Sequence, residues 1–442
     1  MTDLDSRTSD TPPPEPPARG AEGAATGSSG VRLAMLAAVV VLIGLTGGYP
    51  VLVVILALVV MIFLHELGHY ITAKAAGMKV TEFFIGFGPR IWSFHRGETE
   101  YGLKAIPAGA YVKVIGMTQL EEVDPSEEDR TYRSKPYWRR MSVAVAGSTM
   151  HFALALVTLT IVIASTGITQ EDNWNVGRMA DPAGGEASPA AVAGIEIGDE
   201  IQSFDGVSVV TWDDMRDAIL AREVGDTVTV VVDRAGETLA LDVTLGENPD
   251  GGPFLGIGPE YPTVSMAPHT AVVESVKELG SVSVLTVEAI TQVFSPSGLS
   301  NLAGLAVDAS RPSADDTGAS TGGADASPPP ASEPDEGRVI SIFGIVGLSA
   351  DVLQEDPMAA LALFALVNIF IGIFNLIPLL PLDGGHVAIA TYEKGRELFS
   401  RSRERYYADV GKLIPLTYGV IFVLVGVGLI ALYLDIADPI RL

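Results

Sequence analysis

The sequence predicts a polytopic α-helical membrane protein with four core transmembrane helices, or five in all, a membrane-associated β-hairpin and one extracytoplasmic α/β domain. Three observations support this fold class. The chain of 442 residues is 48% hydrophobic, with a positive mean hydropathy. Apolar stretches long enough to cross a bilayer occur in both halves of the chain. The acidic charge lies between them, since residues 166–356 contain 32 Asp or Glu and only 7 Lys or Arg.

The composition also limits the chemistry. The chain has no cysteine, which excludes disulfides, thiolate zinc sites and a cysteine nucleophile, and leaves oxygen and imidazole as ligands for a transition metal. The formal net charge is -26, and nearly all of the excess lies in the acidic segment. Because such a segment repels nucleic acid, we expect no nucleic-acid partner.

The N-terminal region predicts a tail followed by one or two helices. Residues 1–30 are rich in Pro, Ser, Thr and Gly and are expected to form a disordered cytoplasmic tail. The chain is then apolar to about Ala76, and residues 33–64 as one straight helix would measure roughly 48 Å against a hydrocarbon core of about 30 Å. The break at residues 47–50, Gly-Gly-Tyr-Pro, predicts a short helix over 31–47, which spans the membrane, lies tilted in its surface or is an uncleaved signal-like segment. The main helix follows from residue 51 to about 70.

Three further spans are predicted at Met141–Ser165, Met358–Leu380 and Leu413–Leu434. Lys and Arg residues cluster between residues 74 and 140 and again between 394 and 412. By the positive-inside rule both of these loops are cytoplasmic, and the acidic segment lies outside. The protein is therefore expected in the cell membrane as a multi-pass protein, with the lipid bilayer as a partner.

The exterior segment contains three patterns. Residues 174–258 alternate between apolar and polar at 227–232 and 239–245, with helical spacing at 212–221, and so predict a small α/β domain. Residues 267–306 have amphipathic helical spacing, which suits either the membrane surface or packing on the small domain. Residues 307–338, rich in Ser, Ala, Gly, Pro and Asp, predict a disordered insert.

The stretch with the clearest chemistry is Phe63–Tyr70, which contains His65, Glu66 and His69. On a helix the two histidines lie one turn apart on the same face, so both imidazoles can reach one metal ion. Glu66 lies beside them, where it can take a proton from a water that the metal activates. Zinc is favoured because it accepts imidazole and carboxylate ligands and leaves a position open. The alternative is a pair of core histidines, but two His and a Glu in an apolar helix are costly and are functional by default.

A third ligand is expected after the span that ends near Leu380. Pro378 and Pro381 prevent a continuous helix there, so Asp383 can turn into a cavity. The alternative is that Asp383 with the two following glycines only forms a turn at a helix exit. His386 is either a competing ligand or a helix-cap or surface histidine.

These motifs resemble the site-2 protease family of intramembrane zinc metalloproteases. The resemblance rests on His-Glu-Leu-Gly-His in an early helix and on residues 375–384, Asn375…Pro378…Pro381-Leu382-Asp383-Gly384, in a late one, and it covers about 50–442. It is closest to the bacterial PDZ-containing branch, and in particular to actinobacterial regulators of anti-sigma-factor proteolysis. It implies Zn²⁺ as cofactor, zinc ligands at His65, His69 and Asp383, and Glu66 as the catalytic base. Asn375, Pro378 and Gly384 are implied to bind substrate; Asn375 could instead cap a helix.

The resemblance also assigns roles to the other regions. Residues 51–165 and 339–442 become the N-terminal and C-terminal catalytic membrane regions. Residues 80–114 resemble a β-hairpin that pairs with an unwound substrate, and 174–258 resemble a PDZ domain that acts mainly as a size filter. His151 stands where the family usually has Asn, and is either close to the active site or a buried histidine with a backbone partner.

The function that the resemblance implies is cleavage of transmembrane segments in single-span membrane proteins that another protease has already trimmed, such as anti-sigma factors or remnant signal peptides. The active site is expected near the cytoplasmic face. The alternative is a non-enzymatic membrane scaffold in which the small domain binds partner tails and the zinc site is structural.

Overall fold

The computed structural model describes residues 29–117, 121–169, 174–180, 187–248, 251–298, 300, 304, 341–399 and 406–437. The predicted insert at 307–338 and nearly all of the predicted tail at 1–30 lie outside these residues. The chain forms two compact units. Unit 1 comprises Met1–Met150, Ser327–Ala350 and Asn375–Leu442, and unit 2 comprises His151–Ala326 and Asp351–Phe374.

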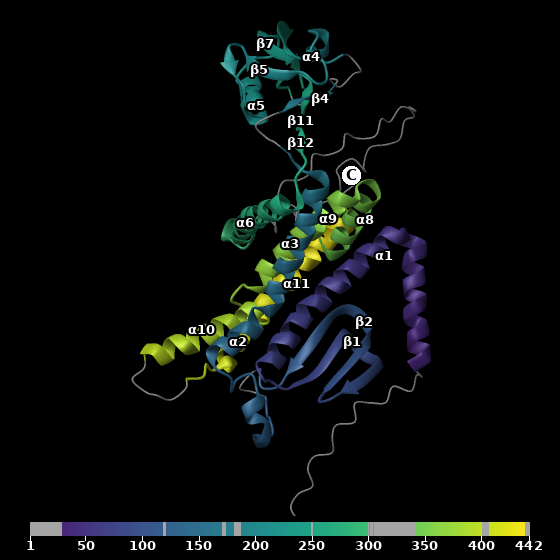
Figure 1. The fold of residues 1–442 in the computed structure, drawn as a ribbon, viewed down its shortest axis with the longest axis vertical. Helices are drawn as coiled ribbons and strands as arrows, with labels where there is room; N and C mark the ends of the chain where they lie inside the picture. Colours follow the sequence, from purple (N-terminus) through teal and green to yellow (C-terminus); the bar gives the residue numbers. More distant parts are fainter. Residues whose placement is uncertain are drawn as a thin grey trace, which may run out of the picture. The chain divides into compact units, whose positions relative to one another are not determined.

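The first helix, α1 (Ser29–Ala75), consists of two segments that meet at a kink, visible in Figure 1. Gly48 has φ 71° and ψ -179°, which is a conformation that residues other than glycine rarely adopt. Pro50 follows and has no backbone N–H to continue the helical ladder. The predicted break at residues 47–50 is thus confirmed. Whether the segment before the kink crosses the membrane stays a prediction.

Within the described residues, four helices are long and apolar enough to cross a membrane: Ala37–Ala75 of α1, α3 (Ala146–Thr166), α9 (Pro357–Asn375) and the helix that includes α11 (Ile414–Ala437). The four predicted core spans are therefore present as helices, but two boundaries were wrong. The span expected from Met141 begins at Ala146, because α2 (Tyr137–Ala144) is a separate helix with Val145 as its C-cap. The span expected to reach Leu380 ends at Asn375, ahead of Pro378 and Pro381.

The predicted hairpin is formed by β1 (Val80–Arg96) and β2 (Thr99–Val114), which pair antiparallel. Residues 82–85 have partners on two sides, at 110–113 and at 100–103, because the long strands are bent by several register shifts. The inner end of the hairpin packs on the end of α1, where Ala73, Met78, Val80 and Val114 form a buried cluster. The short helix η1 (Pro125–Arg130) follows the hairpin.

Residues 174–258 form an α/β domain in unit 2, with the predicted helix at 212–221 and the strands at 227–232 and 239–245 confirmed to within a few residues. Its main sheet has the order β6-β5-β7-β8, and β4 pairs with β11. Its core includes Trp174, Phe204, Met215 and Val230. The elements are β4 (Asn175–Met179), α4 (Pro189–Val192), β5 (Glu200–Phe204), β6 (Val207–Ser208), α5 (Trp212–Leu220), β7 (Thr227–Arg234), β8 (Glu237–Thr244), β9 (Gly246–Glu247), β10 (Pro253–Phe254) and β11 (Ile257–Glu260).

Two short strands, β3 (Ile168–Thr169) and β12 (Thr263–Val264), pair where the chain enters and leaves this domain. The predicted amphipathic helix is α6 (Pro268–Val293). Its Leu279 and Val282 pack against the buried cluster of α3 and α9, so its described core contacts are with these apolar helices and not with the core of the α/β domain. The remaining elements are α8 (Ile342–Glu355), α10 (Asp383–Phe399) and η3 (Val410–Leu413).

Candidate metal centre

The two motif histidines lie on one face of α1, as their spacing predicts. The Nε2 atoms of His65 and His69 are 3.2 Å apart, and both side chains are largely shielded from solvent. Because residues four apart on a helix are stacked one turn above the other, this convergence needs no distortion of the helix.

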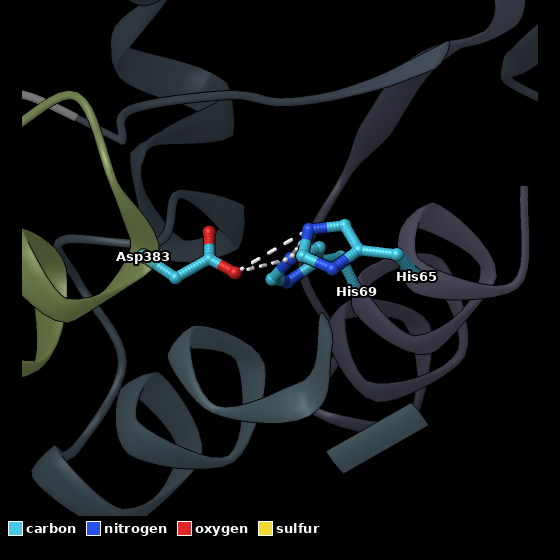
Figure 2. A group of neighbouring side chains, drawn as sticks. All are labelled: His65, His69 and Asp383. Atoms are coloured by element: carbon cyan, nitrogen blue, oxygen red, sulfur yellow. Dashed lines mark hydrogen bonds and ion pairs between the residues drawn. The ribbon is translucent and has the colours of Figure 1, made fainter. Parts of the chain in front are cut away.

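Asp383 completes the group from the second half of the chain. It is the first residue of α10, and its Oδ2 lies 3.1 Å from Nε2 of His69 and 3.4 Å from Nε2 of His65. Figure 2 shows the carboxylate of Asp383 pointing at both imidazoles. Among the described residues, His65, His69 and Asp383 form the one group of three that could hold a metal ion. The histidine motif on α1 and Asp383 on α10, which the sequence predicted separately, therefore lie at the same site.

The donor atoms fit a zinc ion. With bonds of about 2.0–2.2 Å, neighbouring ligand atoms of a tetrahedral zinc site are separated by about 3.3–3.5 Å. The three separations here are 3.1, 3.2 and 3.4 Å. Three lone-pair-bearing atoms at such short range repel one another unless a cation or shared protons lie between them. Two imidazoles and one carboxylate are also a common set for zinc that leaves a position open.

A backbone group orients one of the histidines. Nδ1 of His69 lies 2.8 Å from the carbonyl oxygen of Val143 on α2. Since a carbonyl can only accept a hydrogen bond, Nδ1 carries the proton, which leaves Nε2 free to bind a metal. The sequence analysis missed Val143 because a backbone contact across 74 residues has no local signal.

Two glycines allow the helices to approach the site closely, and they were also missed. A Cβ atom added at Gly147 on α3 would overlap the ring of His65. A Cβ atom added at Gly68 on α1 would lie 2.8 Å from the carbonyl oxygen of Ala146. A glycine inside a helical pattern usually has a packing reason, so this signal was available in the sequence.

Glu66 lies beside the donor group without belonging to it. Its side chain hydrogen-bonds with the backbone of Val112 on β2, so the hairpin holds the carboxylate. Tyr70, one helical turn after Glu66, also contacts the hairpin: its hydroxyl is 2.5 Å from that of Tyr101, and its ring stacks on Phe83. The hairpin therefore packs directly on the turns of α1 that contain His65, Glu66 and His69.

Asp383 is ionised in this setting. Burial alone would raise its pKa, but the hydrogen bond with His69 and the nearby imidazoles outweigh burial and lower the pKa.

The predicted substrate-binding residues lie close to Asp383 in the sequence. Asn375 is the last residue of α9, and Pro378 lies in the short irregular segment between α9 and α10. A Cβ atom at Gly384 would overlap the backbone of Leu376 and Ile377, which gives this glycine a packing reason of its own.

The other two histidines of interest do not join the donor group. His386 lies in the first turn of α10, partly buried beside the ring of Tyr132, and burial lowers its pKa. His151 on α3 is buried, and its Nδ1 is 3.0 Å from the side-chain oxygen of Asn368 on α9. One of its partners is thus a side chain, and the expected backbone partner stays a prediction.

Comparison with known proteins identifies the family of this chain. The sequence profile of Peptidase family M50 matches residues 53–318 and 332–417. The zinc metalloprotease Rip1 of Mycobacterium tuberculosis is 32% identical over 408 residues, which cover 88% of this chain and 97% of the relative. Rip1 of Mycolicibacterium smegmatis is 30% identical over 436 residues, with 89% and 99% covered.

A solved PDZ domain, from the SdrC-like protein of Listeria monocytogenes, matches 21% of this chain and 90% of its own at 24% identity and a TM-score of 0.18. This likeness is weak, and the assignment of 174–258 as PDZ-like stays a prediction. The family match contradicts the alternative of a non-enzymatic scaffold. The curated relatives are zinc metalloproteases, and the His–His–Asp group is compatible with zinc. The chain belongs to Peptidase family M50 and is a zinc-dependent hydrolase.

Proposed function

We propose that this protease is an intramembrane endopeptidase whose zinc ion is held by His65, His69 and Asp383. The observation that carries the proposal is the convergence of their three donor atoms at separations of 3.1 to 3.4 Å. Two of these residues lie on α1, which is long and apolar enough to cross a membrane. A water-dependent reaction placed on such a helix acts on peptide bonds at or inside the bilayer.

Glu66 is proposed as the general base and acid. When bound, zinc supplies Lewis-acid polarisation of the scissile carbonyl and lowers the pKa of water to near neutrality. Glu66 accepts the proton of the attacking water and passes it to the leaving amine. The hydrogen bond with the backbone of Val112 orients its carboxylate beside the histidines. Asn375, Pro378 and Gly384 are proposed to contact the bound substrate.

The hairpin is proposed to present the substrate. A peptide bond inside a helix is shielded by its own hydrogen bonds, so a transmembrane substrate must unwind before it is cut. An extended segment added to β1 or β2 regains its backbone hydrogen bonds as a new strand. Because Val112 on β2 contacts Glu66, a strand added to this sheet lies close to the base.

Charge distribution supports the proposed orientation. The Lys and Arg residues around the hairpin and after α10 favour the cytoplasmic side, and the acidic 166–356 segment favours the outside. The PDZ-like domain at 174–258 would then act as an exterior size filter. Substrates would be single-span membrane proteins that have already lost bulky exterior domains, such as anti-sigma factors or remnant signal peptides, with release on the cytoplasmic side.

The test compares one single-span substrate with and without its exterior domain, using purified full-length enzyme in liposomes. We expect the trimmed form to be cut and the intact form to be cut slowly or not at all, with Glu66→Gln inactive on both. Equal cleavage rates for the two forms would contradict the proposed role of the PDZ-like domain as a size filter. A cleavage site outside the hydrophobic segment of the substrate would refute the proposal that the enzyme cuts within the membrane.

A further inference from the structure

A buried ion pair joins two helices next to the metal centre. Nη1 of Arg140 on α2 lies 2.5 Å from Oε2 of Glu393 on α10, and the two side chains are only 5% and 3% exposed. Among the described residues, Asp199 is the one other charged residue buried to this degree. Charges are buried so fully only when a partner compensates the loss of hydration. The pair connects segments 253 residues apart in the chain.

On α10, Glu393 shares a face with the metal-ligand end of the helix. His386 and Glu393 are seven residues apart, which is two helical turns, and Asp383 is one turn before His386. The ring of Tyr132 packs edge-to-face with His386, at 6.0 Å between ring centroids, and lies 5.9 Å from the guanidinium of Arg140, the partner of Glu393. The second carboxylate oxygen of Glu393 accepts a hydrogen bond from the Ala408 amide.

On α2, Arg140 shares a face with Val143, three residues later, whose carbonyl oxygen accepts the hydrogen bond from His69. The helix α2 therefore contacts both halves of the donor group. It reaches His69 on α1 through Val143, and it reaches the helix that begins with Asp383 through Arg140.

The packing of α10 on α2 leaves a small gap beside the ion pair. A cavity of ≈ 30 Å³, large enough for one water molecule, lies beside the pair and is lined in part by Tyr132, Arg140, His386 and Glu393. Nε of Arg140 is buried and has no hydrogen-bond partner within the described part of the chain. Apolar contacts are non-directional, whereas a charge-assisted hydrogen bond fixes both a distance and an orientation. Stability does not explain the pair either, because apolar residues of similar volume often replace buried ion pairs without loss.

We propose that Arg140 and Glu393 are positioning residues that clamp α10 to α2 and thereby keep Asp383 and His69 at zinc-binding separation. This inference rests on the proposed ligand set. Without the clamp, the neighbouring cavity leaves room for α10 to shift. A shift that moves the carboxylate of Asp383 away from His69, from which it is now 3.1 Å distant, would lower the affinity for zinc.

The test measures zinc affinity by chelator competition, together with the melting temperature, on full-length protein in detergent. In the double variant Arg140→Met/Glu393→Leu both charges are gone and the volume is kept. We expect its melting temperature to stay near that of the wild type and its zinc affinity to fall by about 10-fold to 100-fold, the range seen when a group that orients a ligand is lost. The matched control is Arg234→Met/Asp199→Leu, which removes the Arg–carboxylate pair of the α/β domain and should leave zinc affinity unchanged.

Wild-type zinc affinity in the double variant would overturn the proposal. Should that variant fail to fold, Glu393→Gln, which keeps the size and a neutral acceptor for Arg140, decides the question: weaker zinc binding supports the clamp and unchanged binding overturns it. The measurement needs no substrate. Loss of zinc in the double variant with no cleavage by the wild type would leave the clamp standing and refute the proposed substrate class.

Discussion

His69 donates its Nδ1–H to the carbonyl oxygen of Val143, 2.8 Å away, and so presents its Nε2 to His65 and Asp383. The hydrogen bond sets the tautomer of a residue that sequence alone identifies only as a histidine of the motif. It also ties α1 to α2 at the point where the donor atoms meet, so the proposed metal centre depends on three helices, α1, α2 and α10, rather than two.

Asp383→Asn should weaken zinc binding. The substitution keeps the shape of the side chain but removes the ionised oxygen that lies 3.1 Å from His69. We expect the loss of affinity to exceed the approximately 10-fold to 100-fold typical of groups that only orient ligands. Zinc content after dialysis measures the effect, and Asp409→Asn, at an exposed cap in the same unit, is the control. Full zinc retention in Asp383→Asn would show that the aspartate is only a turn residue.

Gly147→Ala should disturb His65. The added methyl group would overlap the imidazole, so we expect a loss of stability of about 1–3 kcal/mol, typical of overpacking, together with weaker zinc binding. The matched control is Gly395→Ala on α10, where a Cβ atom would meet nothing within 4 Å. There alanine should be neutral or stabilising by up to about 1 kcal/mol. Thermal unfolding and zinc content measure both; equal behaviour of the two variants would refute the close packing of α3 on His65.

The α/β domain should weaken in acid through Asp199. Burial opposes ionisation of this side chain, but hydrogen bonds from Arg234 and the Glu196 amide outweigh burial and lower its pKa. A carboxylate whose folded-state pKa is depressed stabilises the fold above its unfolded pKa of about 3.9, and this contribution is lost as the pH falls through the lower folded-state pKa.

Hydrogen exchange in β5 and β7 of the full-length protein tests this. Below about pH 4 protection should fall in the wild type, whereas Asp199→Asn should already be less stable at neutral pH, by about 1.5–3 kcal/mol, and should change less on acidification. Asp205→Asn, which removes an exposed partner of Arg222, is the control and should have little effect. Identical acid responses in the wild type and Asp199→Asn would contradict the assignment.

Local sequence signals predicted the parts of this protein that depend on local physics. The four-residue spacing of His65 and His69 placed both on one helical face, and Gly48 with Pro50 predicted the kink in α1. The alternation at 227–232 predicted a strand that the structure contains as part of β7.

The parts that depend on distant contacts were not predictable in this way. Nothing local links Val143 to His69 or Arg140 to Glu393, because each pair forms only when the helices pack. The separation of α2 from α3 at Val145 was missed because no proline marks it and Gly147, two residues later, is compatible with a continuous helix. The prolines at 378 and 381 predicted that the helix before Asp383 is interrupted, but not that α9 already ends at Asn375.

The central claim is tested most directly by cleavage of a trimmed single-span substrate by Glu66→Gln and by the zinc-loaded wild type, with zinc content measured on both. We predict equal zinc content and a rate at least about 100-fold lower for Glu66→Gln, as expected when a general base is lost. A chelator should abolish wild-type cleavage, and added zinc should restore it. If Glu66→Gln cuts as fast as the wild type, Glu66 is not the base, and the proposed assignment of the active site is wrong.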